Sequence, residues 1–188
     1  MPSSDPITIP KVLKLVELLQ PKSILDVGVG NGRYGFLFRE ILDWNYGRFI
    51  LPTWETIIDG IEVEPTYITN VHHNVYNIVH IQEWMKFKPN KFYDLCFMGD
   101  VLEHFENEEW KGALEKAKNN SAITIVVCPN WNGSIAQGAW GGNEYEKHRV
   151  ELSPSIVGGK CVFANSKAFI CVFDNEMTGV FDDKEILL

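Results

Sequence analysis

Three alternating glycines separate a short apolar segment from a helical pattern in Leu25-Asp-Val-Gly-Val-Gly-Asn-Gly-Arg-Tyr-Gly35. The apolar segment, residues 23–28, predicts a buried strand, and residues 33–42 predict a helix with one apolar side. Glycine suits such a turn because the chain bends sharply there and lies against a ligand where a Cβ would clash. The pattern therefore predicts an α/β fold with a ligand site at this turn; the alternative is a tight turn with a purely structural role.

Strand-like and helical patterns alternate along the rest of the chain. We expect helices over residues 9–19, 33–42, 65–72 and 106–118, and strands over 23–28, 56–62, 75–81, 92–98 and 121–127. Residues 160–164 and 167–173 flank Asn165-Ser166 and predict a β-hairpin. We therefore predict a doubly wound, mainly parallel sheet of seven strands, with helices on both faces and the antiparallel hairpin at its C-terminal edge.

Length, charge and hydropathy exclude several classes of protein and partner. The 188 residues fit one domain, 1–188, in which 175–188 could be a tail. The net charge of −8 would repel a phosphate backbone, so nucleic acid is an unfavoured partner. No apolar run approaches the ~20 residues of a membrane span, and the first residues do not resemble a signal peptide. We expect no membrane partner and a cytoplasmic location.

The cysteines give no sign of a metal or redox site. The four are Cys96, Cys128, Cys161 and Cys171, and no two of them form a C-x-x-C pair. We expect them to be small buried hydrophobic residues in a reducing compartment. No metal site is predicted.

The glycines also match the dinucleotide fingerprint, as Gly30-x-Gly32-x-x-Gly35. Three observations disfavour NAD. Asp26, just before the loop, would repel a pyrophosphate and suits a ligand with an ammonium group. The acidic partner should lie about 20 residues on, whereas Glu62 lies 32 residues after Gly30. Finally, no residues remain for the second domain that a dehydrogenase generally needs.

The form Asp26-x-Gly-x-Gly-x-Gly32 resembles the first motif of the class I (Rossmann-like) S-adenosylmethionine-dependent methyltransferases. Ile61-Glu62-Val-Glu-Pro65 resembles that family's second motif. Tyr93-Asp94-Leu-Cys-Phe-Met-Gly-Asp100-Val-Leu-Glu-His104 is similar to the fourth strand and turn of its small-molecule, type 11-like branch. The resemblance covers most of the chain, including the hairpin, and implies S-adenosylmethionine as cofactor and a small-molecule acceptor.

The resemblance also implies a set of cofactor-binding residues: Asp26, Gly28, Gly30, Gly32, Glu62, Gln82, Glu83 and Asp100. Glu62 would accept hydrogen bonds from the two ribose hydroxyls, with Glu64 as the alternative if the register differs. The family's third motif normally has an Asp that contacts the adenine amino group. Here His80-Ile-Gln-Glu-Trp84 lacks it, so Gln82 or Glu83 would make that contact, and Trp84 could pack on the ring.

Methyl transfer from a sulfonium needs chiefly alignment, but a hydroxyl acceptor also needs a base. The candidates are Asp100, His104 and His148. Asp100 could instead cap the following helix, and His104 could be structural. His72 and His73 are expected on the surface.

Residues 129–154 have no clear periodicity, and a loop of this length is usually functional. Trp131, Trp140 and Tyr145 could form an apolar wall. Hydrogen bonds from nearby polar residues suggest a sugar or another polar metabolite as acceptor; these residues are Gln137, Asn143, His148 and Arg149. The stretch resembles a family subgroup with a P…QG…GN-x-Y-E-x-H-R string, although residues 150–152 depart from that pattern. It could instead be a packed loop that closes the sheet edge.

Other function classes stay open. A protein or nucleic-acid methyltransferase is one, although the N-P-P-Y string of its amino-methylating branch is absent after the fourth strand. A non-catalytic S-adenosylmethionine-binding module is another. The insertion 44–55 could be a substrate flap or a contact in a homodimer.

Overall fold

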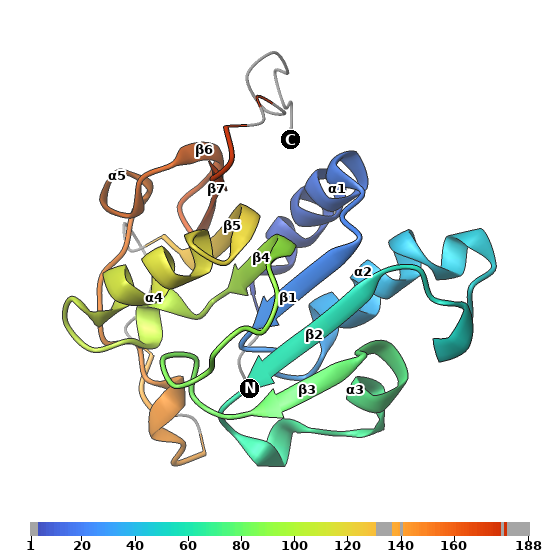
Figure 1. Ribbon diagram of the computed structural model, residues 1–188. Helices are drawn as coiled ribbons and strands as arrows, with labels where there is room; N and C mark the ends of the chain where they lie inside the picture. The colour runs from blue at the N-terminus through green and yellow to red at the C-terminus, as the bar shows by residue number, and fades with distance from the viewer. Residues whose placement is uncertain (1–3, 131–136, 140, 178, 180–188) are drawn as a thin grey trace.

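The computed structural model describes residues 4–130, 137–139, 141–177 and 179, and these form one sheet flanked by helices (Figure 1). The strands are β1 (Ser23–Val27), β2 (Ile57–Glu62), β3 (Ile78–Ile81), β4 (Tyr93–Gly99), β5 (Ser121–Pro129), β6 (Lys160–Ala164) and β7 (Ala168–Asp174). Their order is β3-β2-β1-β4-β5-β7-β6. Neighbours among the first five are parallel, and β7 is antiparallel to both β5 and β6. The predicted seven-stranded sheet with its terminal hairpin is confirmed.

Helices cover both faces of this sheet. They are α1 (Ile9–Leu19), α2 (Arg33–Leu42), α3 (Asn70–Val75), α4 (Glu109–Lys118) and the single turn α5 (Pro154–Val157). Short 3-10 turns connect them: η1 (Pro6–Thr8), η2 (Trp44–Tyr46), η3 (Leu51–Thr53), η4 (Pro65–Tyr67), η5 (Leu102–His104) and η6 (Glu144–Glu146). Residues of α1, α2 and α3 share one buried cluster with the sheet, whereas residues of α4 and α5 share another. The doubly wound arrangement is therefore also confirmed.

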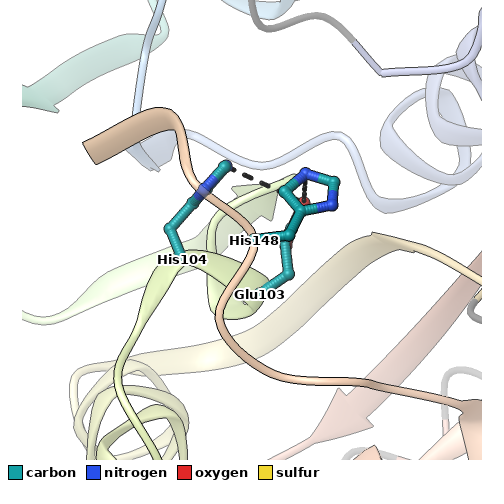
Figure 2. Close-up of side chains that lie close together, drawn as sticks. All are labelled: Glu103, His104 and His148. Carbon is teal, nitrogen blue, oxygen red and sulfur yellow. Dashed lines mark ion pairs between the residues drawn. The ribbon is translucent and has the colours of Figure 1, made fainter. Parts of the chain in front are cut away.

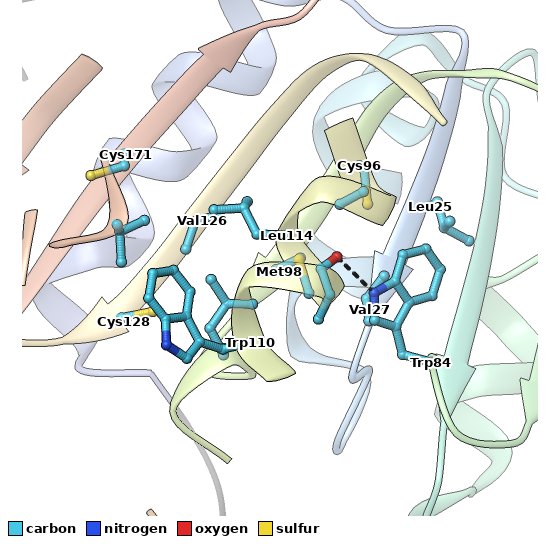
Figure 3. Close-up of a cluster of buried hydrophobic side chains, with 14 of the residues drawn as sticks. Leu25, Val27, Trp84, Cys96, Met98, Trp110, Leu114, Val126, Cys128 and Cys171 are labelled. Atoms are coloured by element: carbon cyan, nitrogen blue, oxygen red, sulfur yellow. Dashed lines mark hydrogen bonds between the residues drawn. The ribbon is translucent and has the colours of Figure 1, made fainter. Parts of the chain in front are cut away.

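The strands β1, β4, β5 and β7 are buried along most of their length, which explains their nearly continuous apolar sequence, whereas the edge strands β3 and β6 are half-buried or exposed. In β1, Ile24 enters the cluster under α1 and α2, and the next residue, Leu25, enters the opposite cluster. Figure 3 shows this second cluster, where Trp110 of α4 and Trp84 of the segment after β3 pack beside the sheet. Between β3 and β4 no helix is formed, so Trp84 and Phe87 supply the apolar cover there.

Two predicted boundaries in the middle of the chain were wrong. The helix predicted over 65–72 is the turn η4 followed by α3, which ends at Val75. Thr69 starts α3, because its Oγ1 accepts a hydrogen bond from Val71 N at 3.3 Å. The strand predicted over 75–81 therefore begins only at Ile78.

The helix predicted over 106–118 begins later, at Glu109. Residues 102–104 form η5, and Asn107 has a φ of +46°, which a continuous right-handed helix does not allow. The helix α5 was not predicted, since one turn is too short to show a period.

A buried ion pair between Arg39 and Asp43 closes the end of α2, and Asp43 also holds the insertion 44–55, since its Oδ1 accepts a hydrogen bond from Glu55 N at 2.8 Å. Asp43 also accepts a hydrogen bond from Arg48 Nε at 2.8 Å. The Arg39 guanidinium lies 3.8 Å from the centre of the Trp54 ring. Trp44 packs edge-on against Phe36 of α2, with ring centroids 5.0 Å apart. Both tryptophans of the insertion thus have contacts within the fold, and the homodimer contact stays a prediction.

Two further expectations can be compared with the structure. Cys96, Cys128 and Cys171 are buried as expected, but Cys161 on the edge strand β6 is exposed, so that expectation was wrong for Cys161. Within the described part of the chain, no helix is long and apolar enough to cross a lipid bilayer.

Candidate functional site

A cavity of about 850 Å³ lies at the carboxyl ends of β1, β2 and β4. Here the connections from β1 and β4 leave toward opposite faces of the sheet, and open α/β sheets bind ligands at such a point. Most of the predicted site residues line it: Asp26, Gly28, Gly30, Glu62, Gln82, Glu83, Asp100 and His104. Gly32 and His148 are not among the lining residues. No residue of the insertion 44–55 lines the cavity either.

The glycine loop needs glycine for different reasons at different positions. Gly28 has a φ of +75°, and a Cβ there would lie 2.6 Å from Cγ2 of Val101. Gly30 has a φ of +51°, but a Cβ there would meet no atom within 4 Å. Gly30 therefore leaves its backbone open toward the cavity. Gly32, with a φ of +78°, is the N-cap of α2.

His72 holds this loop from behind. Its Nδ1 accepts a hydrogen bond from Thr69 N at 3.1 Å, so Nε2 carries the proton and donates to Gly30 O at 2.9 Å. Burial lowers the pKa of His72, which favours this neutral form. His72 is fully buried, so the expectation of a surface position was wrong for it, whereas His73 is exposed.

The Glu62 carboxylate is fixed by three backbone donors. Oε2 accepts from Gly30 N at 2.8 Å, and Oε1 accepts from Val63 N and Glu64 N at 2.9 Å each. The residue is 5% exposed, and burial raises its pKa. Glu64 also lines the cavity, but its carboxylate turns back to accept from Thr66.

Asp26 is buried at the end of β1, where its Oδ2 accepts a hydrogen bond from the Tyr76 hydroxyl at 2.6 Å. Burial raises the pKa of Asp26 to about 7, although the Tyr76 bond acts in the opposite direction. The ring of Tyr76 fits only because Gly35 lacks a side chain: a Cβ there would lie 2.2 Å from Cζ of Tyr76. Sequence reasoning did not find Tyr76, since it lies 50 residues from its partner.

The segment after β3 forms another wall. Gln82 N donates to Glu62 O at 2.9 Å, which joins this segment to the end of β2. Glu83 forms an ion pair with Lys86 at 2.7 Å. Trp84 is 5% exposed, and its Nε1 donates to Ala113 O at 3.0 Å, so much of its ring packs in the core.

Asp100 follows β4 with a φ of +53°, a strained conformation for a residue other than glycine. Its Oδ2 is buried and has no hydrogen-bond partner among the described residues. Burial raises the pKa of Asp100 to about 6. The residue before η5 is Val101, and no side-chain capping bond starts that turn, so the capping role considered for Asp100 is not seen.

Glu103, His104 and His148 come together (Figure 2). Glu103 Oε1 lies 4.0 Å from His104 Nε2 and 3.9 Å from His148 Nε2. Burial lowers the pKa of His104 and lowers that of His148 to about 4, so both rings are neutral at pH 7. Sequence reasoning did not single out Glu103, although it stands next to His104 in the motif.

Part of the predicted acceptor loop reaches the cavity. Asn143, Tyr145 and Arg149 line it, and Tyr145 is 52% exposed. Gln137 Nε2 donates to Glu146 O at 2.7 Å, which fixes this part of the loop. Trp131 and Trp140 lie outside the described residues.

Comparison with known proteins gives the fold. No protein-family model and no curated protein matches the sequence. The DhpI–S-adenosylhomocysteine complex has a TM-score of 0.61 at 12% identity and covers 89% of this chain and 85% of its own. The N-terminal domain of EvdMO1 with S-adenosylhomocysteine bound has a TM-score of 0.61 at 13% identity and covers 90% of this chain and 80% of its own. The N-methyltransferase NodS from Bradyrhizobium japonicum WM9 has a TM-score of 0.55 at 14% identity and covers 90% of this chain and 97% of its own.

These likenesses show that the chain has the fold of the class I S-adenosylmethionine-dependent methyltransferases. The fold expected from the sequence motifs is therefore confirmed.

Proposed function

We propose that the chain transfers a methyl group from S-adenosylmethionine to a small-molecule acceptor. The observation that carries this proposal is the cavity at the carboxyl ends of β1, β2 and β4, where Asp26, the open backbone of Gly30 and Glu62 meet. The fold supports the same class. DhpI and EvdMO1, which share it, hold S-adenosylhomocysteine, the demethylated product of that cofactor.

The residues around the cavity fit this cofactor. Glu62 Oε2 accepts one hydrogen bond, and a carboxylate oxygen has two lone pairs, so it can accept a second bond from a ribose hydroxyl. Asp26 offers a carboxyl group to the ammonium of the methionine part. Gln82 and Glu83 line the cavity, and either would accept a hydrogen bond from the adenine amino group. When bound, the cofactor supplies a methyl group activated by a sulfonium.

The contribution of the chain is alignment and proton removal. The cavity walls would have to hold the donor and the acceptor in line at about 3–3.5 Å, and such alignment accounts for much of the rate of such a displacement. A hydroxyl acceptor must lose a proton. Of the neutral imidazoles, His104 lines the cavity and is therefore better placed than His148 to take that proton.

The acceptor that suits this site is small and polar. Asn143 and Arg149 line the cavity, and Tyr145 brings an exposed aromatic ring. Asn143 Nδ2 already donates to the Tyr67 hydroxyl, and Arg149 pairs with Glu106 and Glu144, but each side chain has further N–H groups that can donate. A sugar or a similar hydroxylated metabolite would use both kinds of contact. The net charge of −8 disfavours a nucleic acid in this role.

Calorimetric titration of the purified chain with S-adenosylmethionine, S-adenosylhomocysteine and NAD tests the proposal. We expect micromolar binding of the first two and none of NAD. Binding of NAD alone would overturn the proposal, because the glycine loop would then serve a pyrophosphate. Binding of S-adenosylmethionine without transfer to any acceptor in a screen of metabolites, peptides and RNA would instead favour a binding module.

A further inference from the structure

One carboxylate and two imidazoles meet at the acceptor side of the cavity. Glu103, His104 and His148 each place one ligand atom so that all three atoms lie within 4.8 Å of one another (Figure 2). We propose that this cluster binds a divalent transition-metal ion, with Mn²⁺, Fe²⁺, Co²⁺ or Zn²⁺ as the class it suits. The metal site itself does not depend on the proposed function.

The state of Glu103 is the main argument. The residue is 1% exposed, and neither carboxylate oxygen has a well-formed hydrogen bond among the described residues. Its polar neighbours are the thiol of Cys128, a weak donor, and its own backbone N–H. A buried carboxylate without strong partners is costly, so such groups are usually paired or bind a metal. The nitrogens of His104 and His148 lie 4.0 and 3.9 Å from Oε1, too far for hydrogen bonds. A bound cation would give all three groups a partner.

The spacing is close to that of a metal site. Zinc bonds to nitrogen and oxygen of about 2.0–2.2 Å imply about 3.4 Å between neighbouring ligand atoms in a tetrahedron. The observed 3.9 and 4.0 Å exceed this by about half an ångström. The three ligand atoms lie within 4.8 Å of one another, so small rotations of all three side chains would have to draw them in around an ion.

His104 already has the hydrogen bond that metal-binding histidines use. Its Nδ1 lies 3.1 Å from Lys147 O, and because a carbonyl only accepts, Nδ1 carries the proton. In that tautomer Nε2 carries no proton and can bind a metal ion, as in sites where a backbone carbonyl orients the ligand. The backbone of Asp100 is a second hydrogen-bonding neighbour of this ring. His148 Nδ1 has no hydrogen-bond partner in the described part of the chain, so that ring can offer either nitrogen.

A second buried carboxyl group adds negative charge beside the cluster. Asp100 acts electrostatically on Glu103, and its Oδ2 also lacks a hydrogen-bond partner within the described ranges. Two buried carboxyl groups at close range favour either bound protons or a cation between them. With two imidazoles added, the set of donors suits transition metals better than Mg²⁺ or Ca²⁺, which prefer oxygen.

Three protein ligands leave positions for water or substrate, as in catalytic metal sites. Because His104 lines the cavity, an open position would face the acceptor. The consequence for chemistry rests on the proposed function. A hydroxyl bound to the ion loses its proton to water, its oxygen bonds to the methyl carbon, and the carbon–sulfur bond breaks to release neutral S-adenosylhomocysteine. With an ion bound, the imidazoles hold the ion and water takes the proton, so this role replaces the proton removal proposed above for His104 in the metal-free chain.

The test is metal binding by tag-free, chelator-treated protein, titrated with Mn²⁺ and Zn²⁺ and followed by calorimetry and Mn²⁺ electron paramagnetic resonance. We expect a single ion to bind per chain, and Glu103→Gln and His148→Asn each to weaken binding about tenfold or more. Matched controls are Glu115→Gln and His73→Asn, which change exposed residues outside the cavity and should bind as the wild type does. No binding by the wild type, or unchanged binding by both cluster variants, would overturn the proposal.

Two measurements keep the test decisive if a variant fails to fold. In the wild type, substoichiometric Mn²⁺ should broaden the ring resonances of His104 and His148 before that of His73; broadening of His73 alone would overturn the proposal. Titration with S-adenosylhomocysteine is independent of the metal. If S-adenosylhomocysteine binds and the metal does not, only the proposed metal site is overturned. If the metal binds and S-adenosylhomocysteine does not, the metal site stands and the proposed function is overturned.

Discussion

The Glu62 carboxylate lines the cavity while it accepts three backbone hydrogen bonds from the loop and the end of β2. We expect Glu62→Ala to weaken binding of S-adenosylmethionine by about 1.5–3 kcal/mol, the range for hydrogen bonds to a charged group. This corresponds to roughly 10- to 150-fold in Kd. Calorimetry measures the change, with Glu115→Ala, on the exposed side of α4, as the control. Unchanged affinity would exclude Glu62 from the site.

Asp26 should make stability depend on pH. Its pKa is about 7 in the folded chain, above the usual 3.8 of the unfolded chain. Between these values the unfolded carboxyl is ionised while the folded one holds its proton, so rising pH destabilises the fold until about pH 7 and has no further effect above it. Asn at this position has no proton to lose and can still accept the Tyr76 bond.

Compared with Asp26→Asn, the wild type should therefore lose about 2–3 kcal/mol of stability between pH 5 and pH 7, at about 1.4 kcal/mol per pKa unit. Urea unfolding of both proteins at pH 5, 7 and 8 measures the difference, in which other titrating groups cancel. A difference that stays constant across this range would contradict the raised pKa.

The residues that sequence reasoning found and those it missed differ in a physical way. Asp26, Gly30 and Glu62 stand at strand ends, and the ends of parallel strands must meet at one edge of the sheet. His72 of α3 lies 42 residues from its partner Gly30, and Tyr76, the residue after α3, lies 50 residues from its partner Asp26. Their contacts depend on how a helix packs, which no local pattern contains.

At the scale of elements, α2 and the residue after α3 approach each other through a glycine. A Cβ on Gly35 would lie 2.2 Å from Tyr76 Cζ, so Gly35→Ala must displace the ring. We expect a loss of about 1–3 kcal/mol, the usual cost of overpacking. Thermal unfolding should show a melting temperature lower by about 2–10 °C.

Gly112→Ala is the control for that prediction, because the same substitution should here raise the stability of the fold. Gly112 lies inside α4, and a Cβ there would make an ordinary contact at 3.6 Å with Met85. Alanine is the better helix former, so we expect a gain of about 0.5–1 kcal/mol. A Gly35→Ala protein as stable as Gly112→Ala would show that Tyr76 can move at little cost.

Element type was predictable along most of the chain because buried strands and amphipathic helices have different periods. The first and last residues of the elements were less predictable. Whether residues 65–75 form one helix or a turn and a later helix depends on the cap that Thr69 makes. The late start of α4 depends on the backbone conformation of Asn107, which the charged, helix-favouring sequence does not reveal.

At the scale of the whole molecule, the cavity joins the ends of β1, β2 and β4 to the segments after β3 and β5, so a ligand there contacts parts far apart in the chain. A ligand that binds only the folded state stabilises it by RT ln(1 + [L]/Kd), about 2.7 kcal/mol at 100 times Kd. S-adenosylhomocysteine at that excess should raise the melting temperature by about 5–10 °C. NAD should cause no rise, and Glu62→Ala should reduce the rise at the same ligand concentration. An unmoved melting temperature with S-adenosylhomocysteine would mean that the cavity serves another ligand, whereas an equal rise in Glu62→Ala would place the ligand elsewhere in the fold.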